Sequence, residues 1–162
     1  MTASGKHARR TGLSVRHGLL AALVCLLLLA LVDTYSRNAN HQAVVSIKGH
    51  QLTVELARTT DEHRRGLQER ERLAPDAGML FIFESDTPEV SFWMDKTLIP
   101  LSLAFIDGRG VITQIEKMQP LTRDSHVSRE PARYVLEVNQ GWFEAHDITV
   151  GDVVDLSRLP DK

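Results

Sequence analysis

Cysteine is almost absent from this sequence. The chain has 162 residues and a single cysteine, Cys25. Residues 33–162 therefore contain no thiol, which excludes cysteine catalysis, a cysteine-based zinc site and a disulfide framework in that part of the chain. We expect its stability to come from packing alone.

Short catalytic motifs are also missing. The sequence has no Gly-x-Ser-x-Gly, no Walker loop, no dinucleotide fingerprint and no His-Glu-x-x-His. Five histidines follow residue 32, none at metal-ligand spacing from another, and surface positions are expected for them: His41, His50, His63, His126 and His146. His126 is the least easily dismissed, because its loop is polar and could cover a cleft. The sequence predicts no metal and no cofactor.

A large excess of one charge is lacking too, since the formal net charge is -2. This near-neutral balance disfavours nucleic acid as a partner, because such binders usually carry a basic excess. This net charge is the sum of two segments with opposite charge. Residues 1–32 contain four Lys and Arg and no carboxylate, whereas residues 33–162 contain 15 Lys and Arg against 21 Asp and Glu, a balance of -6.

The longest apolar run covers residues 18–32, GLLAALVCLLLLALV, behind a basic segment at 1–17. As a helix it would span about 22 Å, which suits a signal-peptide h-region or a thin signal anchor. Small residues for signal cleavage are poorly placed after the run, so an uncleaved anchor is favoured. The basic flank then predicts a cell inner-membrane protein with its soluble domain outside the cytoplasm. If the signal is cleaved, the domain is exported to the periplasm.

A polar linker at 33–42 leads to a single domain at 43–158 with mostly strand-like signals. The alternation in AVVSIKGHQLTVELA predicts a hairpin around Gly49, and TTDEHRRGLQER predicts a short helix from about 60 to 71. Further short strand patterns follow, and QGWFEAHD predicts a helical turn or two. We expect a mainly β (α+β) fold with a compact, barrel-like antiparallel or mixed sheet and two short helices, preceded by the N-terminal hydrophobic helix.

Residues 92–107, FWMDKTLIPLSLAFID, are the most informative stretch. If the strand pattern continues, Trp93 shares one face with Ser91 and Asp95, next to Lys96 and Thr97. A large aromatic ring beside hydrogen-bonding groups is a common way to hold amphipathic ligands. The alternative is that Trp93 plugs one end of the barrel while Asp95 caps a turn.

A second polar face lies on RYVLEVN, where Arg133 and Glu137 alternate against Tyr134, Leu136 and Val138. The two charged residues could pair on the surface, or they could line a pocket with Trp93. The candidate ligand-binding residues are therefore Trp93, Asp95, Lys96, Thr97, Arg133 and Glu137.

Several separated blocks resemble the small domain-of-unknown-function family numbered 192. They are GMLFIF (78–83), FWMDKTLIPLSLAFID (92–107), the step at 118–120 and RYVLEVNQGWFEAHDITVGDVV (133–154), and the likeness spans about residues 44–157. The resemblance implies a free-standing small protein, often behind a signal or anchor, with a compact and mainly β fold. It implies no activity, because none is established for the family.

The sequence departs from the family pattern at several positions. The usual Phe-Trp-Met-Lys-Asn-Thr has Asp95 and Lys96 here, the usual Pro-Leu-Asp ends in Ser102, and the usual Gly-Leu-Met ends in Gln68. If the family's Asn and Asp form a polar site, that site is altered in this chain.

These observations favour a small extracytoplasmic domain that binds a small molecule, a glycan or an envelope protein. Two alternatives remain. One is a hydrolase that uses paired carboxylates, for instance Asp95 with Glu137 or Asp107. The other is a structural accessory protein of the cell envelope that offers a sheet edge to its partner.

Overall fold

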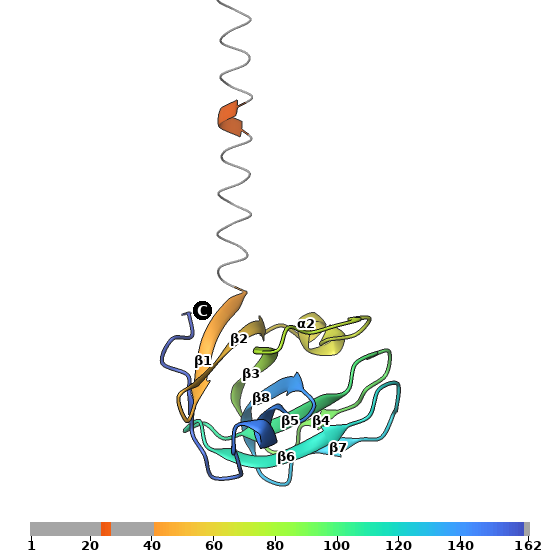
Figure 1. The fold of residues 1–162 in the computed structure, drawn as a ribbon, viewed down its shortest axis with the longest axis vertical. Coiled ribbons are helices and arrows are strands. Elements are labelled where there is room, and N and C mark those ends of the chain that lie inside the picture. Colours follow the sequence, from red (N-terminus) through yellow and green to blue (C-terminus); the bar gives the residue numbers. More distant parts are fainter. Residues whose placement is uncertain (1–23, 27–40, 161–162) are drawn as a thin grey trace, which may run out of the picture. The chain divides into compact units, whose positions relative to one another are not determined.

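The computed structural model describes residues 24–26 and 41–160 (Figure 1). Contacts within the chain divide it into two units, Met1–Ala39 and Asn40–Lys162. In the first unit, residues 24–26 are helical and exposed; the rest of the anchor predicted at 18–32 lies outside the described residues, as does nearly all of the linker. Among the residues described, no helix is both long enough and apolar enough to cross a membrane.

Strands dominate residues 41–160, and the helices there are short. The elements are β1 (Gln42–Ile47), β2 (His50–Ala57), α2 (Thr60–Arg65), β3 (Ala77–Thr87), β4 (Ser91–Phe92), β5 (Leu101–Ile106), β6 (Ile112–Met118), β7 (His126–Val127), β8 (Ala132–Asn139), α3 (Trp142–Ala145) and β9 (Val154–Asp155). The mainly β prediction is confirmed.

The predicted hairpin is formed by β1 and β2. Lys48 and Gly49 both have positive φ, 51° and 86°, and two such residues make the tight turn that matches the twist of paired strands. Val45 lies opposite Leu52 in the register, and both are buried. Alternation in the sequence therefore located this hairpin and its buried face correctly.

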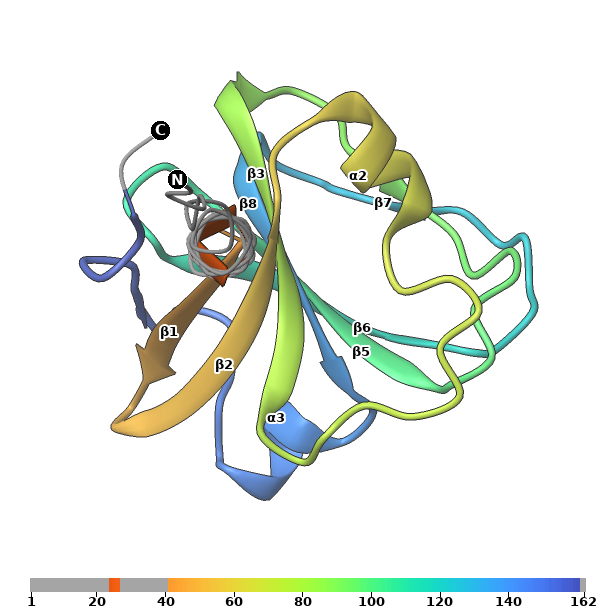
Figure 2. The ribbon, with the colours of Figure 1, turned by 90° about the horizontal axis from the view of Figure 1, so that it is seen from above.

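Seven strands form one mixed sheet in the order β6-β5-β8-β3-β2-β1-β9, and β4 pairs with β7 in a separate two-stranded sheet. All neighbours in the large sheet are antiparallel except β2 and β3, which run parallel. The large sheet curls (Figure 2), but it forms a half-barrel rather than the barrel-like closure expected from the sequence. Its two edge strands approach only at one corner, where Val111 bridges to Val153.

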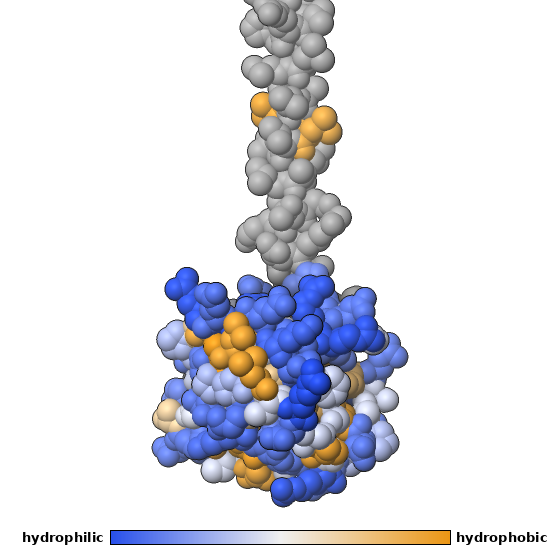
Figure 3. All heavy atoms as spheres, turned by 90° about the vertical axis from the view of Figure 1, so that its right-hand side faces the viewer, coloured by the Kyte–Doolittle hydropathy of each residue, from blue (hydrophilic) through white to orange (hydrophobic). Residues whose placement is uncertain are grey.

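Both faces of the curled sheet are covered. One face carries the Leu80 core, which includes Leu80, Leu136 and Ala104 on adjacent strands and packs against Trp142 and Phe143 of α3. The other face carries the Phe81 core, which consists of Ala57, Leu67, Met79, Phe81, Val90, Met94, Ile99, Leu101, Leu103, Phe105, Met118, Ala132 and Val135. The cover of the Phe81 core comes from the chain after α2 and from the segment around β4. The face of the domain seen in Figure 3 is mostly hydrophilic, with a few separate hydrophobic areas.

The short helix α2 ends earlier than the sequence pattern predicts. Thr59 accepts a hydrogen bond from the Glu62 amide, and the Glu62 carboxylate accepts one from the Thr59 amide. This reciprocal arrangement fixes the first turn. Gly66 has a positive φ of 48° and ends the helix after Arg65. The second half of the helix predicted at 60–71, residues 66–71, is therefore not helical.

Candidate functional site

A pocket of about 440 Å³ lies on the face of the sheet that carries the Phe81 core. Its wall comes from α2 and the residues after it, from β3, from the segment that contains β4, and from single residues of the 96–100 loop and β8. The lining residues are Thr60, His63, Arg64, Arg65, Gly66, Leu67, Gln68, Phe81, Phe83, Thr87, Glu89, Val90, Ser91, Phe92, Trp93, Thr97 and Glu137. The pocket thus joins segments that are far apart in the sequence.

Aromatic rings form much of this wall. The Phe81 and Phe92 rings meet edge to face with their centroids 4.7 Å apart, and the His63 ring lies 4.8 Å from that of Phe83. Trp93 lines the same pocket while remaining 51% exposed. The pocket therefore has an apolar, aromatic interior with one large ring at its solvent side.

His63 is held in place by the backbone. Its Nε2 lies 2.9 Å from the carbonyl oxygen of Ala57. A carbonyl oxygen can only accept, so Nε2 carries the hydrogen and Nδ1 is the nitrogen left for other partners. The ring is thereby fixed against the aromatic wall.

Glu137 is a buried charged residue of the pocket lining. It stands between Met79 and Leu103 on the neighbouring strands, and only 4% of the residue is exposed. No hydrogen bond or ion pair joins its carboxyl group to any other described residue. Burial raises the pKa of Glu137 to about 8, because the charged form loses its hydration without gaining a partner.

The backbone around Glu137 is tightly packed. Gly78 lies on β3 opposite Val138, and a Cβ at Gly78 would come within 2.5 Å of the Glu137 carbonyl oxygen. Only glycine allows β3 and β8 to approach this closely. The close approach fixes the strand that carries Glu137 against its neighbour.

The charged side chains of the lining lie toward solvent. Arg64 and Arg65 are exposed at the end of α2, and Glu89 is exposed before β4. Arg64 contacts Asp61 of the same helix at 3.3 Å, with both side chains well solvated. These charges screen one another at the rim, whereas Glu137 inside the pocket has no opposite charge beside it.

The structure brings three of the six predicted site residues to this pocket: Trp93, Thr97 and Glu137. Thr97 is buried, with 4% of the residue exposed. It lies at the end of a tight turn in which its amide donates to the Met94 carbonyl at 3.1 Å. The sequence reasoning placed Trp93 and Glu137 near one another only as one of two possibilities.

The other three predicted residues lie outside the pocket lining. Asp95 contacts Arg123 at 3.2 Å. Lys96 is exposed with a φ of 60°, and its carbonyl accepts a hydrogen bond from the Glu69 amide. Arg133 donates to the Glu84 carbonyl rather than pairing with Glu137.

The predicted shared face of Ser91, Trp93 and Asp95 is not formed, because β4 ends at Phe92. Beyond it the chain turns, and the Met94 amide donates to the Thr122 carbonyl at 3.1 Å instead of continuing a ladder. The alternation of a strand therefore does not apply to Trp93 and Asp95. Sequence reasoning also missed Phe81, Phe83 and His63. MLFIF is an apolar run that indicates only a buried strand, and nothing local connects His63 to it.

Ser102 is placed for a structural role rather than for ligand binding. It is fully buried on β5, and its Oγ accepts a hydrogen bond from the Gly141 amide at 3.1 Å. Gly141 is the residue that precedes α3. Ser102 thus anchors the start of α3 and does not line the pocket.

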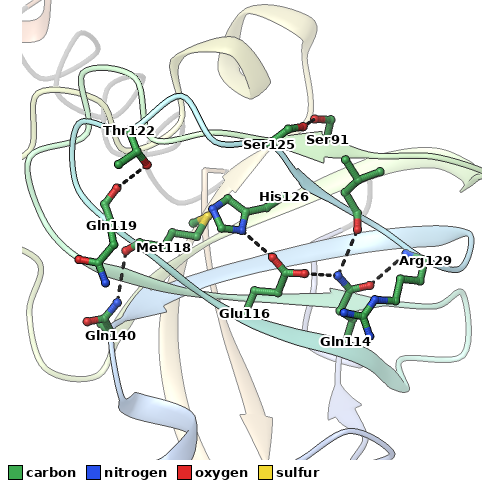
Figure 4. A network of polar contacts seen from close by, with 11 residues as sticks. Ser91, Gln114, Glu116, Met118, Gln119, Thr122, Ser125, His126, Arg129 and Gln140 are labelled. Atoms are coloured by element: carbon green, nitrogen blue, oxygen red, sulfur yellow. Dashed lines mark hydrogen bonds and ion pairs between the residues drawn. The ribbon is translucent and has the colours of Figure 1, made fainter.

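A second group of polar side chains joins β6 to β7 and lies outside the pocket lining. His126 Nδ1 is 2.5 Å from the Glu116 carboxylate, so His126 is not the exposed residue expected for a histidine of this sequence. Gln114 donates to Glu116 and to the Val127 carbonyl, and its oxygen accepts from the Arg129 amide (Figure 4). This group fastens β7 to β6.

No group of three His, Cys, Asp or Glu side chains within the described ranges is arranged to hold a metal ion.

Residues 43–156 match the DUF192 family, which is described as an uncharacterised ACR. The match covers nearly the whole of the described domain. The chain belongs to this family. No curated protein matches the chain.

Two solved structures show how the DUF192 chain compares with proteins of known structure. A candidate transcription regulator from Sinorhizobium meliloti 1021 is 38% identical, with a TM-score of 0.68, over 70% of this chain and 92% of that one. A protein of unknown function from Novosphingobium aromaticivorans DSM 12444 is 30% identical, with a TM-score of 0.67, over 70% of this chain and 84% of that one. Membership of the DUF192 family thus supports the architecture, and a function has to be argued from the pocket residues.

Proposed function

We propose that the domain binds a small organic molecule in the pocket that contains Glu137. The observation that carries this proposal is Glu137, a residue 4% exposed whose carboxyl group has no hydrogen bond or ion pair with any described residue, in a mainly apolar pocket of about 440 Å³. Buried polar groups in proteins almost always have a hydrogen-bond partner. A buried carboxyl group without one, in a cavity of ligand size, is best explained by a partner that arrives with the ligand.

The aromatic wall supports the same proposal. Trp93 is large, half exposed and at the solvent side of the pocket, where an aromatic ring can cover the apolar part of a bound molecule. Thr97 adds a buried hydroxyl group to the lining. An amphipathic ligand would place its apolar part among the rings and a polar group at Glu137.

The alternatives draw less support from the site. Asp95 faces Arg123, and Asp107 accepts hydrogen bonds from the Arg109 and Val111 amides in a turn. Neither aspartate lines the pocket with Glu137, and the second carboxylate of the lining, Glu89, is exposed at the rim. The carboxylate pairs named from the sequence are therefore not assembled in the pocket. An accessory role at a sheet edge would involve β6 or β9 and would not use Glu137.

A regulator of transcription is likewise not favoured for this chain. The description of the Sinorhizobium protein belongs to that protein. In this chain, residues 33–162 carry 15 Lys and Arg against 21 Asp and Glu. That acidic excess opposes contact with a phosphate backbone.

The test is a ligand-observed NMR screen of the full-length chain with small neutral, cationic and anionic aromatic and aliphatic compounds. We expect binders, and we expect Trp93→Ala to weaken them about tenfold because it removes a ring contact. Val150→Ala is the matched control, since Val150 is also an exposed large apolar residue but lies outside the lining. A screen without binders, or equal effects of the two substitutions, would contradict the proposal.

A further inference from the structure

We propose that the ligand of this pocket is an organic ammonium ion, held between the Glu137 carboxylate and the surrounding aromatic rings. The inference rests on the proposed function, because it names the ligand class for the same pocket.

The position of Glu137 favours a positively charged partner. The residue is 4% exposed and belongs to the pocket lining, and its carboxyl group has no hydrogen bond or ion pair within the part of the chain that the structure describes. A buried carboxylate is stabilised most by an opposite charge that also donates hydrogen bonds. An ammonium group supplies both in one small head.

The aromatic rings of the same lining add a second attraction for a cation. Phe81, Phe83, Phe92 and Trp93 line the pocket together with Glu137. The faces of aromatic rings carry negative potential and attract ammonium groups, by about 0.5–2 kcal/mol for one contact depending on desolvation. Aromatic rings beside a carboxylate are a combination suited to recognition of organic cations.

The remaining charges of the lining do not reverse this preference. Arg64 pairs with Asp61 on the exposed side of α2. Arg65 and Glu89, both exposed, are of opposite sign and stand at the rim. His63 is the remaining titratable side chain of the lining. With Asp61 counted against Arg64, the ionised Glu137 leaves the site with one net negative charge, which an ammonium ion neutralises.

Protonation of Glu137 makes the pH dependence of binding different for an ammonium ion and for a neutral ligand. Burial raises the pKa of Glu137 to about 8, so at pH 7 the carboxyl group of the empty pocket is mostly protonated. An ammonium ion binds the ionised form and expels that proton, so its affinity should rise with pH up to about 8. A neutral ligand that accepts a hydrogen bond from the protonated carboxyl group would show the opposite dependence.

The probes are 2-phenylethylammonium, the neutral 2-phenylethanol and the anionic phenylacetate, titrated calorimetrically into the full-length chain. At pH 7.5 to 8.5 we expect the ammonium ion to bind at least tenfold more tightly than either of the others. At pH 7, titrations in buffers of different ionisation enthalpy should show close to one proton released for each ammonium ion bound. Binding of the alcohol or the acid as tight as that of the ammonium ion would overturn the proposal.

Glu137→Gln tests the role of the carboxylate while keeping the size of the side chain. It should lower ammonium affinity at least tenfold, abolish the proton release that accompanies ammonium binding, and leave alcohol binding nearly unchanged. Glu89→Gln, which removes an exposed carboxylate of the same rim, should change ammonium affinity by less than threefold. Loss of affinity in both variants alike would overturn the assignment to Glu137.

The outcomes also separate this inference from the proposed function. Binding of 2-phenylethanol in the pocket without preference for the ammonium ion would overturn the ligand class and leave small-molecule binding standing. Absence of binding by all three probes would overturn the ligand class, and the broader NMR screen would then decide whether the pocket binds any small molecule.

Discussion

At the scale of single residues, Glu137 links the chemistry of the pocket to the stability of the domain. In the unfolded chain a glutamate titrates at its ordinary pKa, whereas burial raises the pKa of Glu137 in the folded protein to about 8. Between these two values the folded state binds more protons than the unfolded state. The free energy of unfolding therefore falls as the pH rises from about 4.5 to 8. Above about pH 8 the full destabilisation caused by the ionised, buried Glu137 is present.

The corresponding prediction concerns Glu137→Gln. The variant should be more stable than the parent at pH 8.5, by at most on the order of 5 kcal/mol, and this advantage should nearly vanish at pH 5. Urea denaturation of the full-length chain, followed by tryptophan fluorescence at both pH values, measures the difference. Glu71→Gln is the control, because Glu71 is exposed. An advantage of Glu137→Gln that is independent of pH would contradict the burial argument.

At the scale of elements, the pocket wall depends on β7, which pairs with only one short strand. Ser91 of β4 lies opposite Val127, and Phe92 lies opposite His126. Because β4 and β7 are two residues long, their own ladder supplies little stability. The side chains of β6 compensate, since Gln114 and Glu116 hold His126, Val127 and the amide of Arg129 (Figure 4).

Replacing Gln114 by alanine should loosen this fastening. Gln114 is buried and makes three hydrogen bonds, so Gln114→Ala should cost about 1–3 kcal/mol of unfolding free energy. Amide hydrogen exchange should become faster at 126–129 and 91–92 in particular. Thr113→Ala is the matched control, because Thr113 is the adjacent residue of β6 and its hydroxyl donates to the Phe105 carbonyl instead. Equal exchange in the two variants would show that Gln114 does not fasten β7.

The elements also show where sequence patterns are sufficient. The β1–β2 hairpin could be predicted because one buried face per strand gives clean alternation, and Gly49 marks its turn. The end of β4 could not be predicted, because it depends on the Thr122 carbonyl, which captures the Met94 amide from another loop. Closure of the sheet was overestimated, since strand patterns do not reveal how edge strands meet.

The same reasoning applies to the site. Trp93 and Glu137 could be proposed because each combines an aromatic or charged side chain with a strand-like neighbourhood. Their partners His63, Phe81 and Phe83 could not, because the pocket is assembled by placing α2 over β3. The pairing of Glu116 with His126 joins residues ten positions apart whose strands are not neighbours in one sheet, so no local pattern indicates it.

At the scale of the whole molecule, the charge distribution of the sequence carries a prediction about orientation. Four Lys and Arg precede the apolar run at 18–32 and residues 1–32 contain no carboxylate, whereas the rest of the chain carries the acidic excess. Positive charges beside an apolar segment favour the cytoplasmic side. We therefore expect the pocket domain to lie outside the cytoplasm, tethered to the inner membrane by residues 18–32 or exported to the periplasm after cleavage.

A reporter fusion at the carboxyl terminus tests this orientation. Alkaline phosphatase fused after Lys162 should be active, because it folds only outside the cytoplasm, and the fused chain should sediment with membranes if the segment is not cleaved. Replacing Lys6, Arg9, Arg10 and Arg16 by glutamine should lower the phosphatase activity several-fold, because the charges that retain the N-terminus inside are gone. As a control, replacing four exposed arginines of the domain, Arg64, Arg65, Arg109 and Arg129, should leave the orientation unchanged. A parent fusion that is inactive and soluble would contradict the placement, and ligands for the pocket would then have to be sought among cytoplasmic molecules.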